Sequence, residues 1–314
     1  MTTETHSPGV LLESQEPLPQ AHSPSFQVPR GACDSHAHVF GDADRYPLDP
    51  KRTFNPPRAG IREYRRMLST LGLERAVIVH SGAYGTDVSA TRDVLIASNG
   101  QWRGIALVDN SVTSEQIAEM DAVGFRGVRF NFIFGHANLW DDVEAIARRI
   151  EPFGWHVQLL VDVRTLPELL PLIARLPVMV VIDHMGRMPT SAGIQDPGFR
   201  ALLQLLRDGR CWCKLSGANR MGDPTPPYRS VLPFARALVD TAADRLVWGT
   251  DWPHVREPGV IPNDGDLLNL LPLWVPDEQL RNSILSDNPA RLYRFADLPA
   301  QADTSAAMGG ADAA

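Results

Sequence analysis

The chain has 314 residues, a length that suits one large α/β domain or two smaller ones. Its hydrophobic content of 44% and charged content of 21% are typical of a globular protein and exclude wholesale disorder. The formal net charge of −7 disfavours nucleic acid and anionic membranes as partners, because both repel an acidic chain. No run of about 18 apolar residues is present that would span a membrane.

The cysteine content and the N-terminus both favour a cytoplasmic protein. Three cysteines cannot make a disulfide framework, and the first residues lack the basic and apolar regions of a secretory signal peptide.

Cys211 and Cys213 lie two positions apart and would share one face of a strand. The simpler interpretation is two small apolar side chains, and the alternative is a metal or redox pair.

Both ends of the chain are predicted to be flexible tails. Residues 1–30 are rich in Pro, Ser, Thr, Glu and Gln, and residues 298–314 also lack apolar periodicity. The first tail would lie over the fold near Phe26–Val28. The body between the tails, residues 31–297, has a suitable length for one barrel domain.

Within this body, eight short apolar runs alternate with helical segments. Several runs are apolar on both faces, as strands of a buried parallel sheet must be. The pattern predicts an α/β fold, a single-domain (β/α)8 TIM-like barrel, with a doubly wound sheet as the alternative. No glycine-rich nucleotide-binding motif follows any strand. The expected strands are Cys33–Phe40, Arg75–Ser81, Trp102–Asp109, Arg126–Phe132, Trp155–Asp162, Val178–His184, Cys211–Ser216 and Arg245–Asp251. The expected helices are Ile61–Leu71, Val88–Ser98, Ser114–Val123, Trp140–Phe153, Leu166–Arg175, Pro197–Arg207 and Arg229–Ala242.

Polar side chains gather where several of these strands end. Catalytic groups of such barrels lie at the carboxyl ends of the strands. His36 and His38 are two positions apart, so both imidazoles point to one side and could ligate a metal or hold a substrate oxygen. His184 and Asp251 at two other strand ends favour this functional interpretation over two surface histidines. The remaining histidines considered lack such support: His6, His22, His136 and His156.

Four motifs together resemble the amidohydrolase superfamily: D-S-H-A-H at 34–38, I-D-H-M-G-R at 182–187, W-G-T-D-W-P-H at 248–254 and D-N-P-A-R-L-Y-R-F at 287–295. Within it, the chain looks most like the branch of 2-pyrone-4,6-dicarboxylate lactonases, sugar-acid lactonases and 4-sulfomuconolactone hydrolases. The resemblance implies lactone hydrolysis. It also implies catalytic roles for Asp251, His184, His36 and His38. The pyrone-dicarboxylate enzyme of this branch is thought to work without metal, whereas other members bind zinc. One Zn²⁺ held by His36, His38 and Asp251 is therefore allowed but not required.

Two departures from the metal-dependent superfamily members narrow the expected chemistry. The strand that would carry a bridging Lys has Arg129 and Asn131 instead. The next strand offers Gln158 and Asp162 but no metal-binding His near its end. A binuclear hydrolase is therefore disfavoured, and a metal-dependent decarboxylase of the same superfamily becomes the second alternative. A barrel that only binds acidic ligands is the non-enzyme alternative.

Arginines at strand ends predict an acidic substrate. Arg129, Arg187 and Arg220 are expected to bind its acid groups, because a guanidinium matches a carboxylate or sulfonate in shape and charge. Neutral hydrogen bonds would come from Ser81, Tyr84 and Asn131.

The preferred substrate is the sulfonated lactone 4-sulfomuconolactone, an intermediate of aromatic-compound degradation, which would yield maleylacetate and sulfite. Pyrone-dicarboxylate lactonases have a second Arg six residues after the position of Arg129, where this chain has Gly135. Alternatives are 2-pyrone-4,6-dicarboxylate or a sugar-acid lactone. In the expected mechanism, the histidines or a metal polarise the lactone carbonyl and Asp251 accepts a proton from the attacking water.

Overall fold

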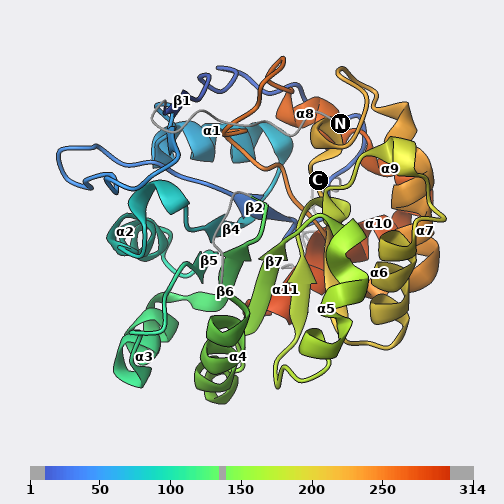
Figure 1. The fold of residues 1–314 in the computed structure, drawn as a ribbon. Coiled ribbons are helices and arrows are strands. Elements are labelled where there is room, and N and C mark those ends of the chain that lie inside the picture. The colour runs from blue at the N-terminus through green and yellow to red at the C-terminus, as the bar shows by residue number, and fades with distance from the viewer. Residues whose placement is uncertain (1–10, 134–138, 298–314) are drawn as a thin grey trace, which may run out of the picture.

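Eight parallel strands form a nearly closed barrel in the computed structural model, which describes residues 11–133 and 139–297 (Figure 1). Neighbours in the sheet follow chain order, from β2 to β10. This order confirms the predicted barrel over a doubly wound sheet, in which the strand order would reverse at a switch point. The barrel strands are β2 (Cys33–Ala37), β4 (Arg75–Val79), β5 (Trp102–Ala106), β6 (Phe125–Asn131), β7 (His156–Leu160), β8 (Val180–Ile182), β9 (Cys211–Leu215) and β10 (Leu246–Trp248).

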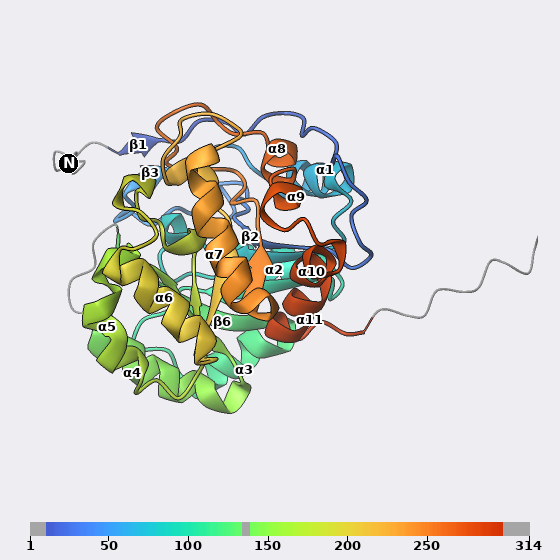
Figure 2. The same ribbon diagram turned by 90° about the vertical axis from the view of Figure 1, so that its right-hand side faces the viewer.

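Helices cover the outside of the barrel (Figure 2). Seven of them match the predicted segments to within a few residues: α1 (Ile61–Leu71), α2 (Ser89–Ala97), α3 (Ser114–Val123), α4 (Leu139–Ile150), α5 (Leu166–Ile173), α6 (Pro197–Arg207) and α7 (Leu232–Ala242). Four further helices were not predicted, because segments this short show little periodicity. They are α8 (Asp264–Leu268), α9 (Leu271–Trp274), α10 (Glu278–Asn282) and α11 (Asn288–Tyr293). No helix of the described residues has the length and apolar character needed to cross a membrane.

The ends of α3 show how local sequence fixes an element. The Thr113 side chain accepts a hydrogen bond from the Gln116 backbone N–H, and the Gln116 side chain bonds back to the Thr113 backbone. This reciprocal arrangement satisfies two amides that the first helical turn leaves unpaired. At the other end Gly124 has φ of 109°, a conformation that glycine adopts readily. The helix begins and ends as the sequence predicts.

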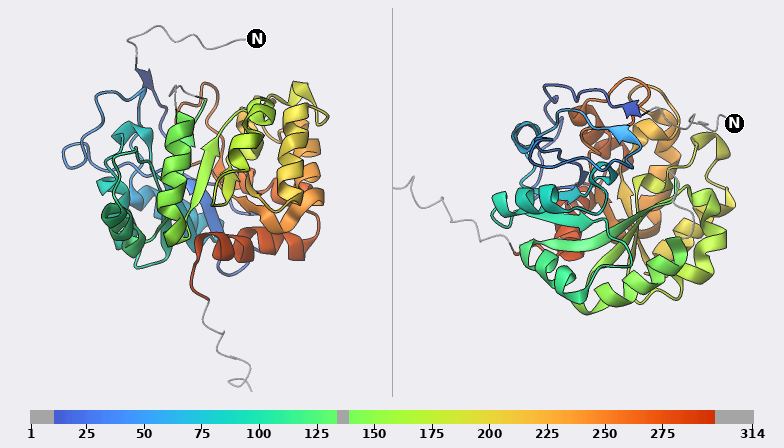
Figure 3. Two further views of the ribbon diagram at one scale, coloured as in Figure 1. Left: turned by 60° about the horizontal axis from the view of Figure 1, so that its bottom comes forward. Right: turned by 60° about the vertical axis from the view of Figure 1, so that its left-hand side comes forward.

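Apolar side chains fill the interior of the barrel below the polar strand ends. Val77 and Val79 of β4 pack there with Ile105 and Val181. Tyr293 belongs to the same cluster. The C-terminal helices lie across the end of the barrel opposite the carboxyl ends of the strands (Figure 3). The three cysteines are buried and unpaired, which supports the simpler interpretation of the pair in β9.

The barrel closes at the junction of its first and last strands, β2 and β10, here called the seam. Backbone hydrogen bonds cross it just after β10: Asp251 N–H donates to the His36 carbonyl at 2.8 Å, and His38 N–H donates to the Trp252 carbonyl at 2.7 Å. These bonds bring together backbone segments that are more than 200 residues apart in the chain. Three of the four residues expected to be catalytic, His36, His38 and Asp251, therefore meet at the seam.

A buried carboxylate strengthens the seam from within. Asp34 accepts hydrogen bonds from Thr250 N–H at 2.9 Å and from the Thr250 hydroxyl at 2.6 Å. It also accepts from the Tyr64 hydroxyl at 2.9 Å and from His36 N–H at 3.1 Å. Burial raises the pKa of Asp34 to about 6, and these donors oppose that rise. One side chain thus ties β2 to the β10 end and to α1.

The N-terminal segment differs from the predicted flexible tail over its described part, residues 11–30, here called the strap. Residues Leu12–Glu13 form β1, which pairs in parallel with β3 (Phe54–Asn55). Further along, His22 N–H donates to Asn263 Oδ1 at 2.8 Å, and the Arg281 guanidinium lies over the Phe26 ring at 5.0 Å. The strap gains these bonds from distant parts of the fold, so its local composition could not predict them. Residues 1–10 and the predicted tail 298–314 lie outside the described residues.

Replacing Asp34 by alanine should lower the free energy of unfolding by about 3–5 kcal/mol, because several buried donors would lose their acceptor at once. Urea unfolding followed by circular dichroism measures this loss. Asp44→Ala, at an exposed loop position, is the matched control and should change stability by less than about 0.5 kcal/mol. Equal stability of the two variants would show that Asp34 does not hold the seam.

Candidate active site

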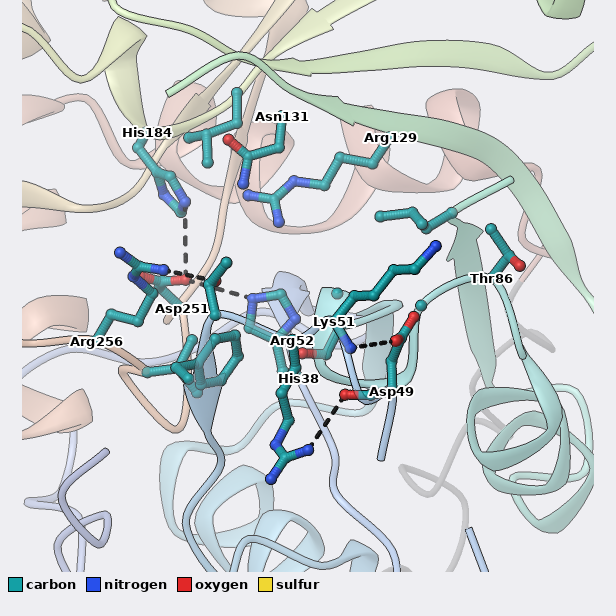
Figure 4. A pocket seen from close by; sticks show the side chains of 18 of the residues that line it. His38, Asp49, Lys51, Arg52, Thr86, Arg129, Asn131, His184, Asp251 and Arg256 are labelled. Carbon is teal, nitrogen blue, oxygen red and sulfur yellow. Dashed lines mark hydrogen bonds and ion pairs between the residues drawn. The ribbon is translucent and has the colours of Figure 1, made fainter. Parts of the chain in front are cut away.

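A pocket of about 390 Å³ opens at the carboxyl ends of the barrel strands (Figure 4). Its volume suits a small organic molecule. Six cationic and three acidic side chains line it, although acidic residues outnumber cationic ones in the chain as a whole. The cationic residues are Lys51, Arg52, Arg129, Arg187, Arg220 and Arg256, and the acidic ones are Asp49, Asp109 and Asp251. The pocket is therefore locally suited to an anion.

The structure brings together the four residues expected to be catalytic. Asp251 Oδ1 lies 3.6 Å from His36 Nε2, 3.7 Å from His184 Nε2 and 3.9 Å from His38 Nε2. All four residues are buried, with at most a few per cent of the surface of each exposed. The register of β2 shifts between Asp34 and Ala37, so His36 lies within the shift and His38 directly after it, and such irregularities re-aim side chains at a strand end.

Unusual backbone conformations shape the two loops that carry the other half of the cluster. His184 has φ of 53° and Asp251 has φ of 68°, both in the left-handed region that residues with a Cβ seldom adopt. Gly217 makes room for His184, because a Cβ there would lie 2.8 Å from the His184 Cβ. The surrounding fold thus holds both side chains in conformations that they would rarely adopt in isolation.

The histidines of the cluster are neutral at physiological pH. Burial lowers the pKa of His38 to about 4 and that of His184 to about 3, and it lowers the pKa of His36 well below its usual value. His38 Nδ1 lies 2.7 Å from the Val79 carbonyl, which can only accept a hydrogen bond. The hydrogen of neutral His38 therefore sits on Nδ1, and the Nε2 lone pair faces Asp251.

Arg220 holds Asp251 in place, a contact that was not expected for this arginine. Its Nε donates to Asp251 Oδ2 at 2.7 Å, and another nitrogen donates to the Val255 carbonyl at 3.1 Å. A third nitrogen lies 3.6 Å from Glu257. Burial disfavours the charged form of Asp251, but Arg220 and the surrounding histidines together keep the pKa of Asp251 well below its usual value. These bonds hold Arg220 against Asp251, and Arg220 also lines the pocket, so its contact with the substrate stays a prediction.

A buried polar network that the sequence analysis missed lies beneath the cluster. Lys214 of β9 is completely buried, and its Nζ lies 3.1 Å from His36 Nδ1, 2.8 Å from Gln158 Oε1 and 3.4 Å from Asp183 Oδ1. Arg129 Nε donates to Asp183 Oδ2 at 2.9 Å. Burial opposes ionisation of Asp183, yet Lys214 and its other neighbours hold its pKa well below the usual range.

The signal that could have revealed this network is the spacing within β9. Trp212 and Lys214 are two positions apart, so a strand that turns Trp212 into the barrel must turn Lys214 inward as well. Burial lowers the pKa of Lys214 to about 8, and Asp183 opposes that change. A lysine in this position needs anionic and polar partners from other strands, and these are not visible in local sequence.

The candidate metal ligands differ in one member from the expected set. His36, His184 and Asp251 each offer a ligand atom, and the three atoms lie within 4.8 Å of one another. The expected set had His38 in place of His184. Separations of 3.6 and 3.7 Å from Asp251 Oδ1 are close to the edges of about 3.3–3.5 Å in a tetrahedral zinc site with bonds of about 2.0–2.1 Å. His36 Nε2 is buried and lacks a hydrogen-bond partner among the described residues, so the donor set fits a metal.

The other expected substrate contacts fall into two groups. Ser81, Asn131, Arg129 and Arg187 line the pocket, and burial lowers the pKa of Arg187 to about 10. Tyr84 does not line it: its hydroxyl accepts a hydrogen bond from Gly41 N–H, and its side chain lies at a separate hollow.

Three cationic residues of the pocket were not expected, because they come from long loops without a motif: Lys51, Arg52 and Arg256. Gly135 and His136 lie outside the described residues.

Comparison with known proteins places the chain in a family. The family model described as Amidohydrolase matches residues 33–295, which is most of the chain. The chain belongs to the amidohydrolase family. This membership confirms the resemblance seen in the sequence motifs and agrees with the barrel and with the position of the pocket.

The relatives are named as lactone-transforming enzymes. The 4-sulfomuconolactone hydrolase of Hydrogenophaga intermedia is 39% identical over 85% of this chain and 90% of its own length. The 2-pyrone-4,6-dicarboxylate hydrolase of Comamonas testosteroni is 36% identical over 86% of this chain and 92% of its own. A crystal structure from Agrobacterium tumefaciens, without ligand, has a TM-score of 0.81 and 29% identity, covering 88% of this chain and all of its own. The two named hydrolases support a lactonase acting on an ester bond.

The buried histidines should make the protein less stable as the pH falls. Burial lowers the pKa of His80 to about 4, so in the pH range between about 6.5 and 4 the unfolded chain binds a proton that the folded chain excludes. The free energy of unfolding should therefore decrease across this range as the pH is lowered. Urea unfolding at several pH values gives the slope of the free energy of unfolding against pH. In His80→Gln this slope should be smaller than in the wild type by up to about 1.4 kcal/mol per pH unit. The same slope in both proteins would contradict the lowered pKa of His80.

Arg220→Gln should reduce kcat for the lactone substrate about 100-fold, because Asp251 would lose the donor that orients it. Steady-state kinetics on purified protein measures the effect. Arg164→Gln is the matched control, since Arg164 pairs with Asp162 at an exposed position outside the pocket, and its kcat should equal that of the wild type. A wild-type kcat in Arg220→Gln would remove Arg220 from the positioning role.

Proposed function

We propose that this chain hydrolyses an acidic, unsaturated lactone from aromatic-compound degradation, and that 4-sulfomuconolactone is its substrate. The observation that carries the proposal is the meeting of Asp251 with three neutral histidines in a pocket lined by cationic side chains. Hydrolysis of an ester needs a proton acceptor beside the attacking water, and an acidic lactone needs cations to bind it. The named activities of the relatives support the same chemistry.

Asp251 and His38 together would position the attacking water. Their facing atoms, Oδ1 and Nε2, are 3.9 Å apart, which allows both to accept hydrogen bonds from one water molecule. Asp251 is ionised at physiological pH because its pKa is held low, so it can accept the proton as water attacks the carbonyl carbon. The bond between the carbonyl carbon and the ring oxygen then breaks, and the ring oxygen takes up the proton from Asp251.

His36 and His184 would face the lactone carbonyl on the other side of Asp251. Their neutral imidazoles could serve either as N–H donors to the carbonyl oxygen or as ligands of a metal. A zinc ion held by His36, His184 and Asp251 would supply Lewis-acid polarisation of the carbonyl and would acidify a bound water. Arg129 and Arg187 would bind an acid group of the lactone and orient the ring, since both line the pocket.

The sulfonated substrate adds a second step that needs no further catalyst. Ring opening of 4-sulfomuconolactone leaves a hydroxyl group and a sulfonate on the same carbon. The C–S bond then breaks as the hydroxyl oxygen forms a ketone, releasing sulfite with its electron pair and a proton. The products are maleylacetate and sulfite in equal amounts. The cytoplasm is the proposed location, in keeping with the three buried, unpaired cysteines.

Incubation of the purified protein with 4-sulfomuconolactone should release one sulfite per lactone consumed, measured by a colorimetric thiol-exchange reagent. Asp251→Asn should lower kcat about 10³-fold, because the amide cannot accept the proton. Metal analysis of the same preparation should find close to one equivalent of zinc if the three-residue site is occupied in solution. Faster hydrolysis of 2-pyrone-4,6-dicarboxylate, or an Asp251→Asn variant of wild-type rate, would contradict the proposal.

A further inference from the structure

The pocket has two ends, and only one of them contains the reacting groups. His184 and Asp251 lie at one end, whereas Lys51 and Thr86 lie at the other, with Arg129 and Asn131 along the wall between them (Figure 4). A substrate whose ester carbonyl sits beside Asp251 would extend its far side toward Lys51. The proposed mechanism uses no residue of this far end.

Lys51 differs in its partners from two of the arginines that line the pocket. Arg129 is paired with Asp183, and Arg220 is paired with Asp251. Within residues 11–133 and 139–297, the Lys51 ammonium forms no ion pair with a carboxylate. It thus offers a positive charge to the pocket that other described side chains do not neutralise by direct contact.

The loop holds Lys51 in a defined position. Its backbone N–H donates to Asp49 Oδ1 at 2.6 Å, and Asp49 N–H donates to the Ala83 carbonyl at 2.8 Å. Gly85 permits this close packing, because a Cβ at that position would lie 2.1 Å from Asp49 Oδ2. The turn around Asp49 is therefore fitted against the loop that follows β4.

The strap secures the same loop from its other side. β1 pairs with β3, which begins three residues after Lys51, and Asn55 Nδ2 donates to Glu13 Oε1 at 2.5 Å. Ser14 N–H donates to the Asn55 carbonyl at 3.1 Å. A loop anchored at both ends can present a charged side chain with a smaller loss of conformational entropy on binding.

We infer that Lys51 determines specificity by binding the anionic group of the substrate that lies farthest from the hydrolysed ester. This inference rests on the proposed function, and it assigns the chain to lactones that carry two separated anionic groups. Lys51 is exposed, so its contribution should depend on salt, unlike that of a buried pair. A lactone with a single acid group would use the reacting end alone.

Calorimetric titration with two stable ring compounds separates this inference from turnover. One probe, 4-sulfobenzoate, carries anions at opposite ends of its ring, and the other, benzoate, carries one. The wild type should prefer 4-sulfobenzoate. Lys51→Gln should lower affinity for 4-sulfobenzoate about 5–10-fold and affinity for benzoate less than twofold, while Lys51→Arg restores the preference. The loss should shrink at about 0.5 M salt.

Arg45→Gln provides the matched control, because Arg45 belongs to the same loop but lies at a different hollow and pairs with Asp93. It should leave both affinities unchanged. Equal binding of the two probes by the wild type, or equal loss for both in Lys51→Gln, would overturn the inference. If the wild type binds the probes as expected but hydrolyses no acidic lactone, the proposed function fails while the Lys51 subsite stands. If it hydrolyses lactones but Lys51→Gln keeps the preference, the subsite alone fails.

Discussion

The Asp34 carboxylate, buried between the first and last strands of the barrel, is the interaction on which the site depends. It binds Thr250 through two donors and Tyr64 through a third, while backbone bonds join His36 to Asp251 directly above it. The sheet has no continuous ladder between β2 and β10, so these few bonds set the distance across the seam. The separation of 3.6 Å between His36 and Asp251 is a consequence of that closure.

Charged side chains surround the residues that meet at the seam. Lys214 and Asp183 form a buried network under His36, and Arg220 fixes the far oxygen of Asp251. Burial favours the neutral form of the histidines, while Arg220 favours the ionised form of Asp251. A carboxylate that stays charged among neutral imidazoles can accept a proton or bind a metal, and surrounding cations attract an anionic lactone. These features together would allow the proposed hydrolysis of an acidic lactone by a chain whose net charge is negative.

Much of this arrangement could be predicted from the sequence, because local patterns determine it. Apolar runs located the strands, and the carboxyl ends of parallel strands must share one mouth, so His36, His184 and Asp251 were expected to meet. Lys214 was missed because its partners come from β2, β7 and β8, and a single lysine in an apolar run gives no local sign of them. The contact of Arg220 with Asp251 was not predicted for the same reason, since the Asp251 oxygen that engages it lies on another loop. The strap was expected to lie over the fold only near Phe26–Val28, because most of its other bonds are to distant residues.

The central claim is that water held by the Asp251 cluster attacks the lactone carbonyl. Hydrolysis of the lactone in ¹⁸O-labelled water, stopped after a single turnover, tests this claim most directly by mass spectrometry of the product. The account predicts one ¹⁸O atom in the newly formed carboxylate and none introduced at the carbon that carried the ring oxygen. Two results would contradict the claim. One is ¹⁸O introduced, during bond cleavage, at the carbon that carried the ring oxygen, and the other is a rearranged product that contains no ¹⁸O.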